Sequence, residues 1–161
     1  MAPKYPTRND LPEQTRDRMV SLLNQQLADT FDMYSQLKQA HWNVKGLQFF
    51  QLHELFDTLA SDVFGYIDTI AERVTILGGT AKGTLRMAGT GSTLPEYPED
   101  LTEGKAHLVA LTERMASLAA STRKAIGIAD EVGDADTADL FTAVSRDVDK
   151  ALWFLESHLV G

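Results

Sequence analysis

The 161-residue sequence contains no cysteine. This absence excludes disulfide bonds, thiolate metal ligands and cysteine nucleophiles. No stretch approaches the roughly 18 uninterrupted apolar residues that a membrane-spanning helix needs. The first residues, Met-Ala-Pro-Lys-Tyr-Pro, lack the apolar segment of a signal peptide. We therefore expect a cytoplasmic protein without a membrane segment.

Positive charge is also scarce, since 15 Lys and Arg residues stand against 23 Asp and Glu residues and give a formal net charge of -8. An acidic surface repels phosphate backbones and attracts cations, so the composition favours metal chemistry over nucleic-acid binding. Hydrophobic residues make up 43% of the chain. A chain of this length and composition is expected to form one domain over residues 1–161.

Apolar residues recur at steps of three and four, which predicts helices. The expected long helices cover residues 10–42, 48–77, 101–129 and 136–159, after a flexible tail at 1–9. The segment between the second and third helices is rich in Gly, Thr, Ser and Pro, and it could hold one short extra helix near 84–87. A connection this long is typical of a chain that crosses a bundle between parallel helices. The sequence thus predicts an all-α, ferritin-like four-helix bundle with a long crossover between helices two and three.

Five side chains form a candidate metal site: His41, His53, Asp57, Asp68 and Glu72. At about 100° per residue, the four on the second helix share one face about 100° wide. Imidazole and carboxylate groups together are the ligands expected for a non-haem iron site.

The length of this helix separates the candidate ligands into two pairs. At about 1.5 Å per residue, His53 lies roughly 28 Å from Glu72, so the two cannot bind the same metal in one chain. Antiparallel packing of two copies about a two-fold axis near residues 62 and 63 would bring each His53–Asp57 pair to the other copy's Asp68–Glu72 pair. Two equivalent sites shared between two chains would result.

The same residues have simpler interpretations. Carboxylates on a helix face usually form a solvated stripe, and a single histidine is more often structural than a ligand. His107 and His158 have no partner at ligand spacing, so we interpret both as structural. Ser61 and Gly65 are small side chains near the candidate face and would allow two helices to approach closely.

Several segments resemble the Dps family, the miniferritins named as DNA-binding proteins from starved cells. They are Lys-Gln-Ala-His-Trp-Asn-Val-Lys-Gly at 38–46, His-Glu-Leu-Phe-Asp at 53–57, Asp-Thr-Ile-Ala-Glu-Arg at 68–73, Leu-Gly-Gly at 77–79, Asp-Thr-Ala-Asp-Leu at 136–140, Ser-Arg-Asp-Val-Asp-Lys at 145–150 and Trp153. The resemblance extends from about Thr7 to Leu159. It implies a hollow dodecamer that oxidises Fe(II), preferably with hydrogen peroxide, and stores the ferric product as a mineral.

The resemblance also implies roles for the five residues. His41, His53 and Asp57 of one subunit would face Asp68 and Glu72 of its two-fold mate in a ferroxidase centre (enzyme class 1.16) with two iron positions. Glu72 would bridge the irons, Asp68 and His41 would complete the tighter position, and His53 and Asp57 would hold the weaker one. Zinc and manganese suit the same ligands.

Other expectations concern surfaces. The resemblance suggests Asp134 and Asp139 as residues of a pore that draws iron in. Trp42 is expected to pack at an interface, with electron donation to the site as the alternative. Only Lys4 and Arg8 are basic before the first helix, so we expect weak or absent DNA binding. A nucleoid-compacting architectural protein is the alternative function, and a structural oligomer with vestigial ligands is a third.

Overall fold

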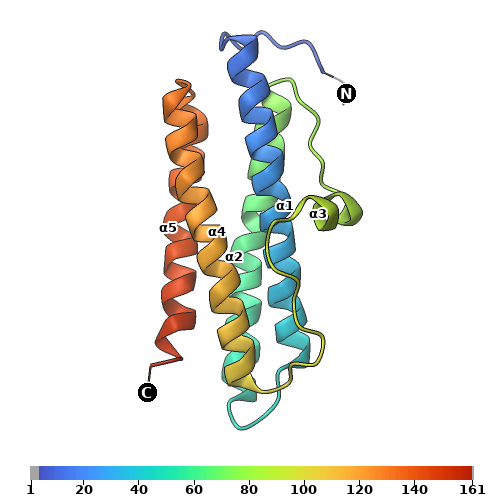
Figure 1. The fold of residues 1–161 in the computed structure, drawn as a ribbon, viewed down its shortest axis with the longest axis vertical. Coiled ribbons are helices and arrows are strands. Elements are labelled where there is room, and N and C mark those ends of the chain that lie inside the picture. Colours follow the sequence, from blue (N-terminus) through green and yellow to red (C-terminus); the bar gives the residue numbers. More distant parts are fainter. Residues whose placement is uncertain (1–3, 161) are drawn as a thin grey trace.

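The computed structural model describes residues 4–160. It contains five helices in chain order, and no strand occurs among the described residues: α1 (Glu13–Asn43), α2 (Phe49–Ile76), α3 (Leu85–Gly91), α4 (Gly104–Glu131) and α5 (Ala135–Ser157). The four long helices lie side by side along the long axis of the molecule, and α3 stands to one side of them (Figure 1). The predicted all-α bundle with one short extra helix is confirmed.

The bundle consists of two helical hairpins. α1 packs mainly against α2, and α4 packs mainly against α5. Both hairpin turns contain a glycine with a positive φ, Gly46 at 108° and Gly133 at 77°, a conformation that other residues adopt only with strain. The buried core includes Phe56, Leu111 and Phe141, and each such apolar side chain stabilises the fold by about 1.5–3 kcal/mol on burial.

The crossover from α2 to α4 is fixed along α1 by hydrogen bonds. Asp29, a residue with 1% exposure, accepts hydrogen bonds from the backbone N–H (2.6 Å) and the hydroxyl (3.1 Å) of Thr93. Asp32 accepts one from the hydroxyl of Ser92 at 2.6 Å. Because a buried carboxylate is costly without such partners, these bonds specify the path of the crossover.

Two helices begin later than the apolar pattern predicts. Before α1, the side chain of Asn9 accepts a hydrogen bond from the N–H of Leu11 at 3.0 Å, which makes a turn where a helix was expected from residue 10. Before α4, the carbonyl of Thr102 accepts a hydrogen bond from the N–H of Lys45 at 2.8 Å. This long-range contact holds the chain extended up to Glu103, so α4 starts at Gly104 rather than at residue 101.

Residues 4–9, expected to be a flexible tail, lie against the bundle, whereas residues 1–3 fall outside the described part. The N–H of Tyr5 donates to the carbonyl of Gly78 at 2.9 Å. The ammonium of Lys4 pairs with Asp17 at 2.7 Å and Glu13 at 3.1 Å.

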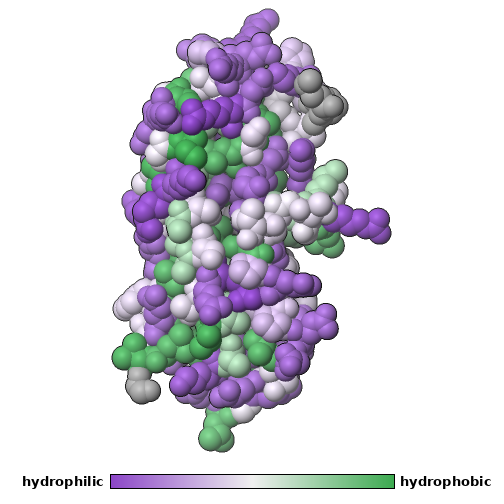
Figure 2. Space-filling model, viewed as in Figure 1, coloured by the Kyte–Doolittle hydropathy of each residue, from purple (hydrophilic) through white to green (hydrophobic). Residues whose placement is uncertain are grey.

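The surface has no large segregated apolar area on the face formed by α1, α4 and the crossover, where polar and apolar residues are interspersed (Figure 2). Within residues 4–160, none of the helices combines the length and the apolarity that crossing a membrane requires.

Candidate metal centre

The turn between α1 and α2 brings His41 and His53 together. Their rings stack with centroids 3.7 Å apart and an interplanar angle of 21°. Nδ1 of His41 lies 2.8 Å from the carbonyl oxygen of His53, and Nδ1 of His53 lies 2.8 Å from the carbonyl oxygen of His41. The carbonyl of His41 is in the last turn of α1, where carbonyls lack a helical partner, so the second bond also caps that helix.

These reciprocal bonds determine the tautomer of both histidines. A carbonyl oxygen only accepts, so each ring carries a proton on Nδ1, and in the neutral ring the lone pair is then on Nε2. Neither Nε2 has a hydrogen-bond partner among the described residues. A neutral imidazole whose other nitrogen is bonded to a carbonyl is the form in which histidine usually binds a metal.

Asp57 follows His53 by one helical turn and pairs with Lys38 of α1. The Lys38 ammonium lies 2.5 Å from Oδ1 of Asp57 and 5.7 Å from the centre of the Trp42 ring. This hydrogen bond is the main cause that lowers the pKa of Asp57. The charge of Lys38 acts in the same direction, as would protonation of the two histidines, against the effect of burial. Asp57 therefore remains an ionised ligand candidate, although it already has a cationic partner.

Sequence reasoning did not single out Lys38. A signal was present, because Lys38 precedes His41 by three residues and so lies on the same face of α1.

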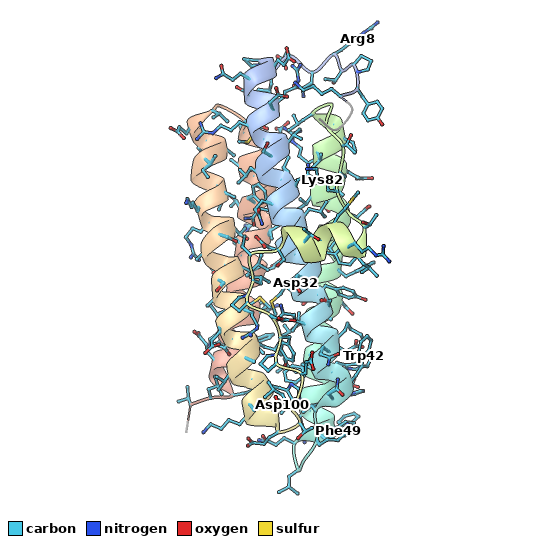
Figure 3. The ribbon with its side chains drawn as sticks, turned by 45° about the vertical axis from the view of Figure 1, so that its right-hand side comes forward. Arg8, Asp32, Trp42, Phe49, Lys82 and Asp100 are labelled. Atoms are coloured by element: carbon cyan, nitrogen blue, oxygen red, sulfur yellow. The ribbon has the colours of Figure 1, made fainter. Side chains whose placement is uncertain are left out.

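Around Asp57 the surface has a small hollow of about 150 Å³, lined by Tyr34, Lys38, Asp57, Ala60, Ser61 and Phe64. Several large apolar side chains are exposed here and near the α1–α2 turn: Trp42 (61%), Phe49 (40%), Phe50 (68%) and Phe64 (55%). Figure 3 shows Trp42 and Phe49 at the same end of the bundle. Exposed aromatic groups in this number are typical of a surface that another protein chain covers.

Asp68 and Glu72 lie on the same exposed face of α2, toward its other end. Neither carboxylate has a side-chain partner among the described residues. Asp68 follows His53 by 15 residues, which at about 1.5 Å per residue separates them by roughly 22 Å along the helix. Within residues 4–160 of one chain, no three His, Asp or Glu side chains meet in a way that could hold a metal ion. One chain thus offers two separate sets of candidate ligands.

The two predicted pore residues differ in their surroundings. Asp134 is 1% exposed, caps α5 through the N–H (3.0 Å) and hydroxyl (2.6 Å) of Thr137, and pairs with Arg73 at 2.7 Å. Asp139 is exposed. Both assignments depend on how chains pack together and stay predictions.

The other two histidines have structural partners. His107 is buried and bonds to the hydroxyl of Tyr97 at 2.6 Å. His158 follows α5, where its Nδ1 lies 2.7 Å from the carbonyl oxygen of Phe154.

Comparison with known proteins agrees with this architecture. The family model of the ferritin-like domain matches residues 20–161. The DNA protection during starvation protein of Agrobacterium fabrum is 48% identical over 155 residues, which cover 96% of each chain. The chain belongs to the Dps family of ferritin-like proteins.

Solved structures of Dps proteins have the same fold. DpsC from Streptomyces coelicolor is 34% identical and superposes with a TM-score of 0.94, covering 99% of this chain and 93% of its own. The Dps protein from Vibrio cholerae O1, described as a member of a broad superfamily of ferritin-like diiron-carboxylate proteins, is 26% identical with a TM-score of 0.88 and covers 93% of this chain and 94% of its own. The resemblance to Dps drawn from the sequence motifs is thereby confirmed.

Proposed function

We propose that this protein is a ferroxidase that takes Fe(II) as substrate at sites between two subunits. It oxidises the iron preferably with hydrogen peroxide and stores the ferric mineral in a hollow dodecamer. Each site would consist of His41, His53 and Asp57 together with Asp68 of the partner subunit and Glu72 of the partner subunit. Removal of Fe(II) and peroxide, the two reagents of hydroxyl-radical formation, would protect DNA without direct contact.

The reciprocal His41–His53 bonds are the observation that carries this proposal. They hold two imidazoles in the metal-binding tautomer at the surface, next to an ionised Asp57. The exposed Asp68 and Glu72 on the same helix face are available to a second copy that packs in the opposite direction.

The ligand set is suited to oxidation. Hard carboxylate ligands stabilise Fe(III) relative to Fe(II) and so lower the reduction potential of bound iron. Glu72 is the candidate bridge between two irons, while Asp68 and His41 would hold the tighter position. Iron at the position of His53 and Asp57 competes with Lys38 for the carboxylate, which supports its assignment as the weaker position. Zinc or manganese could replace iron at either.

The test uses the purified apoprotein. Fe(II) is added without oxygen, hydrogen peroxide follows, and ferric absorbance and peroxide consumption are recorded. We expect rapid oxidation in the natural protein and none above the protein-free rate in Asp68→Ala/Glu72→Ala. A matched control, Glu99→Ala/Asp100→Ala, removes two exposed crossover carboxylates and should oxidise normally. Equal rates in all three proteins would exclude the proposed ligands.

Nucleoid compaction, the alternative function, is less well supported. Lys4 is engaged with Asp17 and Glu13, so Arg8 is the only basic side chain in residues 4–9 without an acidic partner. Figure 3 shows Arg8 at the end of the bundle opposite Phe49. With few phosphate contacts from an acidic protein, we expect no mobility shift of plasmid DNA at about 150 mM salt. A clear shift under these conditions would contradict this expectation.

The remaining assignments are proposals of the same kind. Asp139 is exposed and able to line an entry pore for cations. Asp134 is buried and would contribute indirectly, by fixing the start of α5. We propose a cytoplasmic location, in keeping with the absence of cysteine and of a membrane-spanning helix among the described residues.

A further inference from the structure

A pair formed by the half-buried Tyr97 and the buried His107 lies outside the candidate metal centre. Tyr97 belongs to the crossover and His107 to the first turn of α4, and the phenol oxygen lies 2.6 Å from Nδ1 of the imidazole. Burial raises the pKa of Tyr97 well above its usual value and lowers the pKa of His107. Both groups are therefore uncharged at neutral pH. With the imidazole proton on Nε2, the phenol donates and Nδ1 accepts.

This pair is connected to the candidate metal centre through Phe56. The ring of Phe56 lies 6.3 Å from that of His107, centre to centre, and the ring of Tyr97 lies 6.0 Å from that of His107. Phe56 is fully buried and follows His53 by three residues, a spacing that places side chains next to each other on a helix, with about 5–6 Å between their Cβ atoms. The buried Phe56 and His107 thus lie between the half-buried Tyr97 and a candidate iron ligand.

The proposed reaction lacks one electron when a site holds a single Fe(II), and the Tyr97–His107 pair can supply it. Hydrogen peroxide needs two electrons to become two water molecules, and each Fe(II) supplies one. When a site holds a single Fe(II), the second electron must come from another donor. Without one, the peroxide is cleaved to a hydroxyl radical, which is the product that the proposed function avoids.

We propose that Tyr97 donates this second electron and that His107 takes up its proton, an inference that rests on the proposed ferroxidase function. In the balanced step, Fe(II), the tyrosine, neutral His107, one hydrogen peroxide and two protons from solvent give Fe(III), a neutral tyrosyl radical, protonated His107 and two waters. Iron and tyrosine each lose one electron, and both electrons reduce the O–O bond. The phenol O–H bond breaks, and its proton moves 2.6 Å or less to Nδ1.

Arg114 favours this coupled loss of a proton and an electron. Its guanidinium carbon lies 5.6 Å from the centre of the Tyr97 ring, so a positive charge on the ring is disfavoured and the radical must be neutral. His107 is the group bonded to the phenol that can accept the proton.

The other described tyrosines are less suitable. Tyr5 is 58% exposed, and the hydroxyl of Tyr34 has no acceptor among the described residues. Tyr66 donates to the carboxylate of Asp147, which is exposed to solvent and is a much weaker base than imidazole.

The test is electron paramagnetic resonance on the complete protein, loaded without oxygen with one Fe(II) per site and then mixed with hydrogen peroxide. We expect a tyrosyl radical, identified by the change in its hyperfine pattern when the protein carries ring-deuterated tyrosine. Tyr97→Phe, which removes only the hydroxyl, should abolish the signal and increase hydroxyl-radical release to a spin trap. His107→Gln keeps a polar side chain but offers a far weaker base, and should also abolish it. Tyr66→Phe is the matched control and should retain the signal.

A second experiment, in which the protein is loaded with two Fe(II) per site, distinguishes failure of this inference from failure of the proposed ferroxidase function. If the natural protein does not consume peroxide even then, the ferroxidase function itself is wrong. If it does, yet the radical is absent or survives in both Tyr97→Phe and His107→Gln, the pair only holds the crossover against α4 and the inference is overturned.

Discussion

The sharing of each metal site between two chains can be tested by subunit complementation. One variant, His41→Ala/His53→Ala, loses the imidazoles near the α1–α2 turn. The other, Asp68→Ala/Glu72→Ala, loses the carboxylates roughly 22 Å further along α2. Each variant alone should be inactive, because both sites of its two-fold pair lack ligands.

Co-assembly of the two variants should restore activity by an amount that symmetry determines. In a mixed pair, the histidines of the carboxylate variant meet the carboxylates of the histidine variant, which gives one intact site and one that lacks both sets. Random pairing of equal amounts makes half of the pairs mixed, so the expected activity is about one quarter of that of the natural protein.

The assay is peroxide-driven Fe(II) oxidation by co-expressed variants with different tags, whose ratio in the assembly is measured by mass spectrometry. As a calibration, the carboxylate variant is mixed with Glu99→Ala/Asp100→Ala, which should give about one half of the natural activity by the same counting. The shared site would be refuted if the calibration mixture has half of the natural activity but the mixture of the two ligand variants has none. In that case all ligands of a site would come from one chain, and a second chain could not replace those that a variant lacks.

Three further predictions concern stability. Asp134→Ala leaves Arg73 buried without its 2.7 Å partner and should reduce the free energy of unfolding by about 3–5 kcal/mol in urea titrations. Gly79→Ala would place a Cβ 2.6 Å from both γ-carbons of Val20, a stiff side chain, and should cost about 1–3 kcal/mol in the same assay. Burial lowers the pKa of His107 below 6.5, so the unfolded chain binds its proton first and stability should fall as pH drops below this value, by at most about 1.4 kcal/mol per pH unit. His107→Gln should flatten that dependence.

Matched variants make the first two predictions specific. Asp136 lies 3.6 Å from Arg73 but its side chain is 83% exposed, so Asp136→Ala should cost less than about 1 kcal/mol. A Cβ on Gly127 would meet nothing within 4 Å, and Gly127→Ala in the last turns of α4 should stabilise by up to about 1 kcal/mol. Equal losses of unfolding free energy from Asp134→Ala and Asp136→Ala would contradict the importance of burial. A His107→Gln protein whose stability depends on pH as in the natural protein would contradict the role of that histidine.

Local periodicity predicts the fold well because α1, α2, α4 and α5 each bury one continuous apolar stripe. The late start of α1 follows from the local turn between Asn9 and Leu11, whereas the other errors occur where contacts distant in sequence decide. The start of α4 depends on the bond from Lys45 to Thr102, and the position of residues 4–9 depends on Tyr5 meeting Gly78. Neither contact has a periodic signal in the sequence.

For the candidate site, helical spacing alone placed Asp68 and Glu72 on one exposed face of α2 together with His53. Spacing could not predict that His41 and His53 bond to each other's backbone, since this requires the geometry of the turn between them. The pairing of Lys38 with Asp57 likewise depends on how closely α1 and α2 approach. Residue types and periodicity predict which groups share a face, whereas the partners of those groups follow from packing.

The exchange of hydrogen bonds between His41 and His53 joins residues only 12 positions apart. Contacts this local form early, before distant parts of the chain meet. A newly made chain would therefore carry its two imidazoles in place while the carboxylates that complete each site await a second chain. Two imidazoles and one carboxylate already paired with Lys38 are fewer ligands than the proposed shared site provides. Under the proposed function, iron would be retained only after assembly, when the proposed hollow shell can receive its oxidised product, and unassembled subunits would leave the iron unbound.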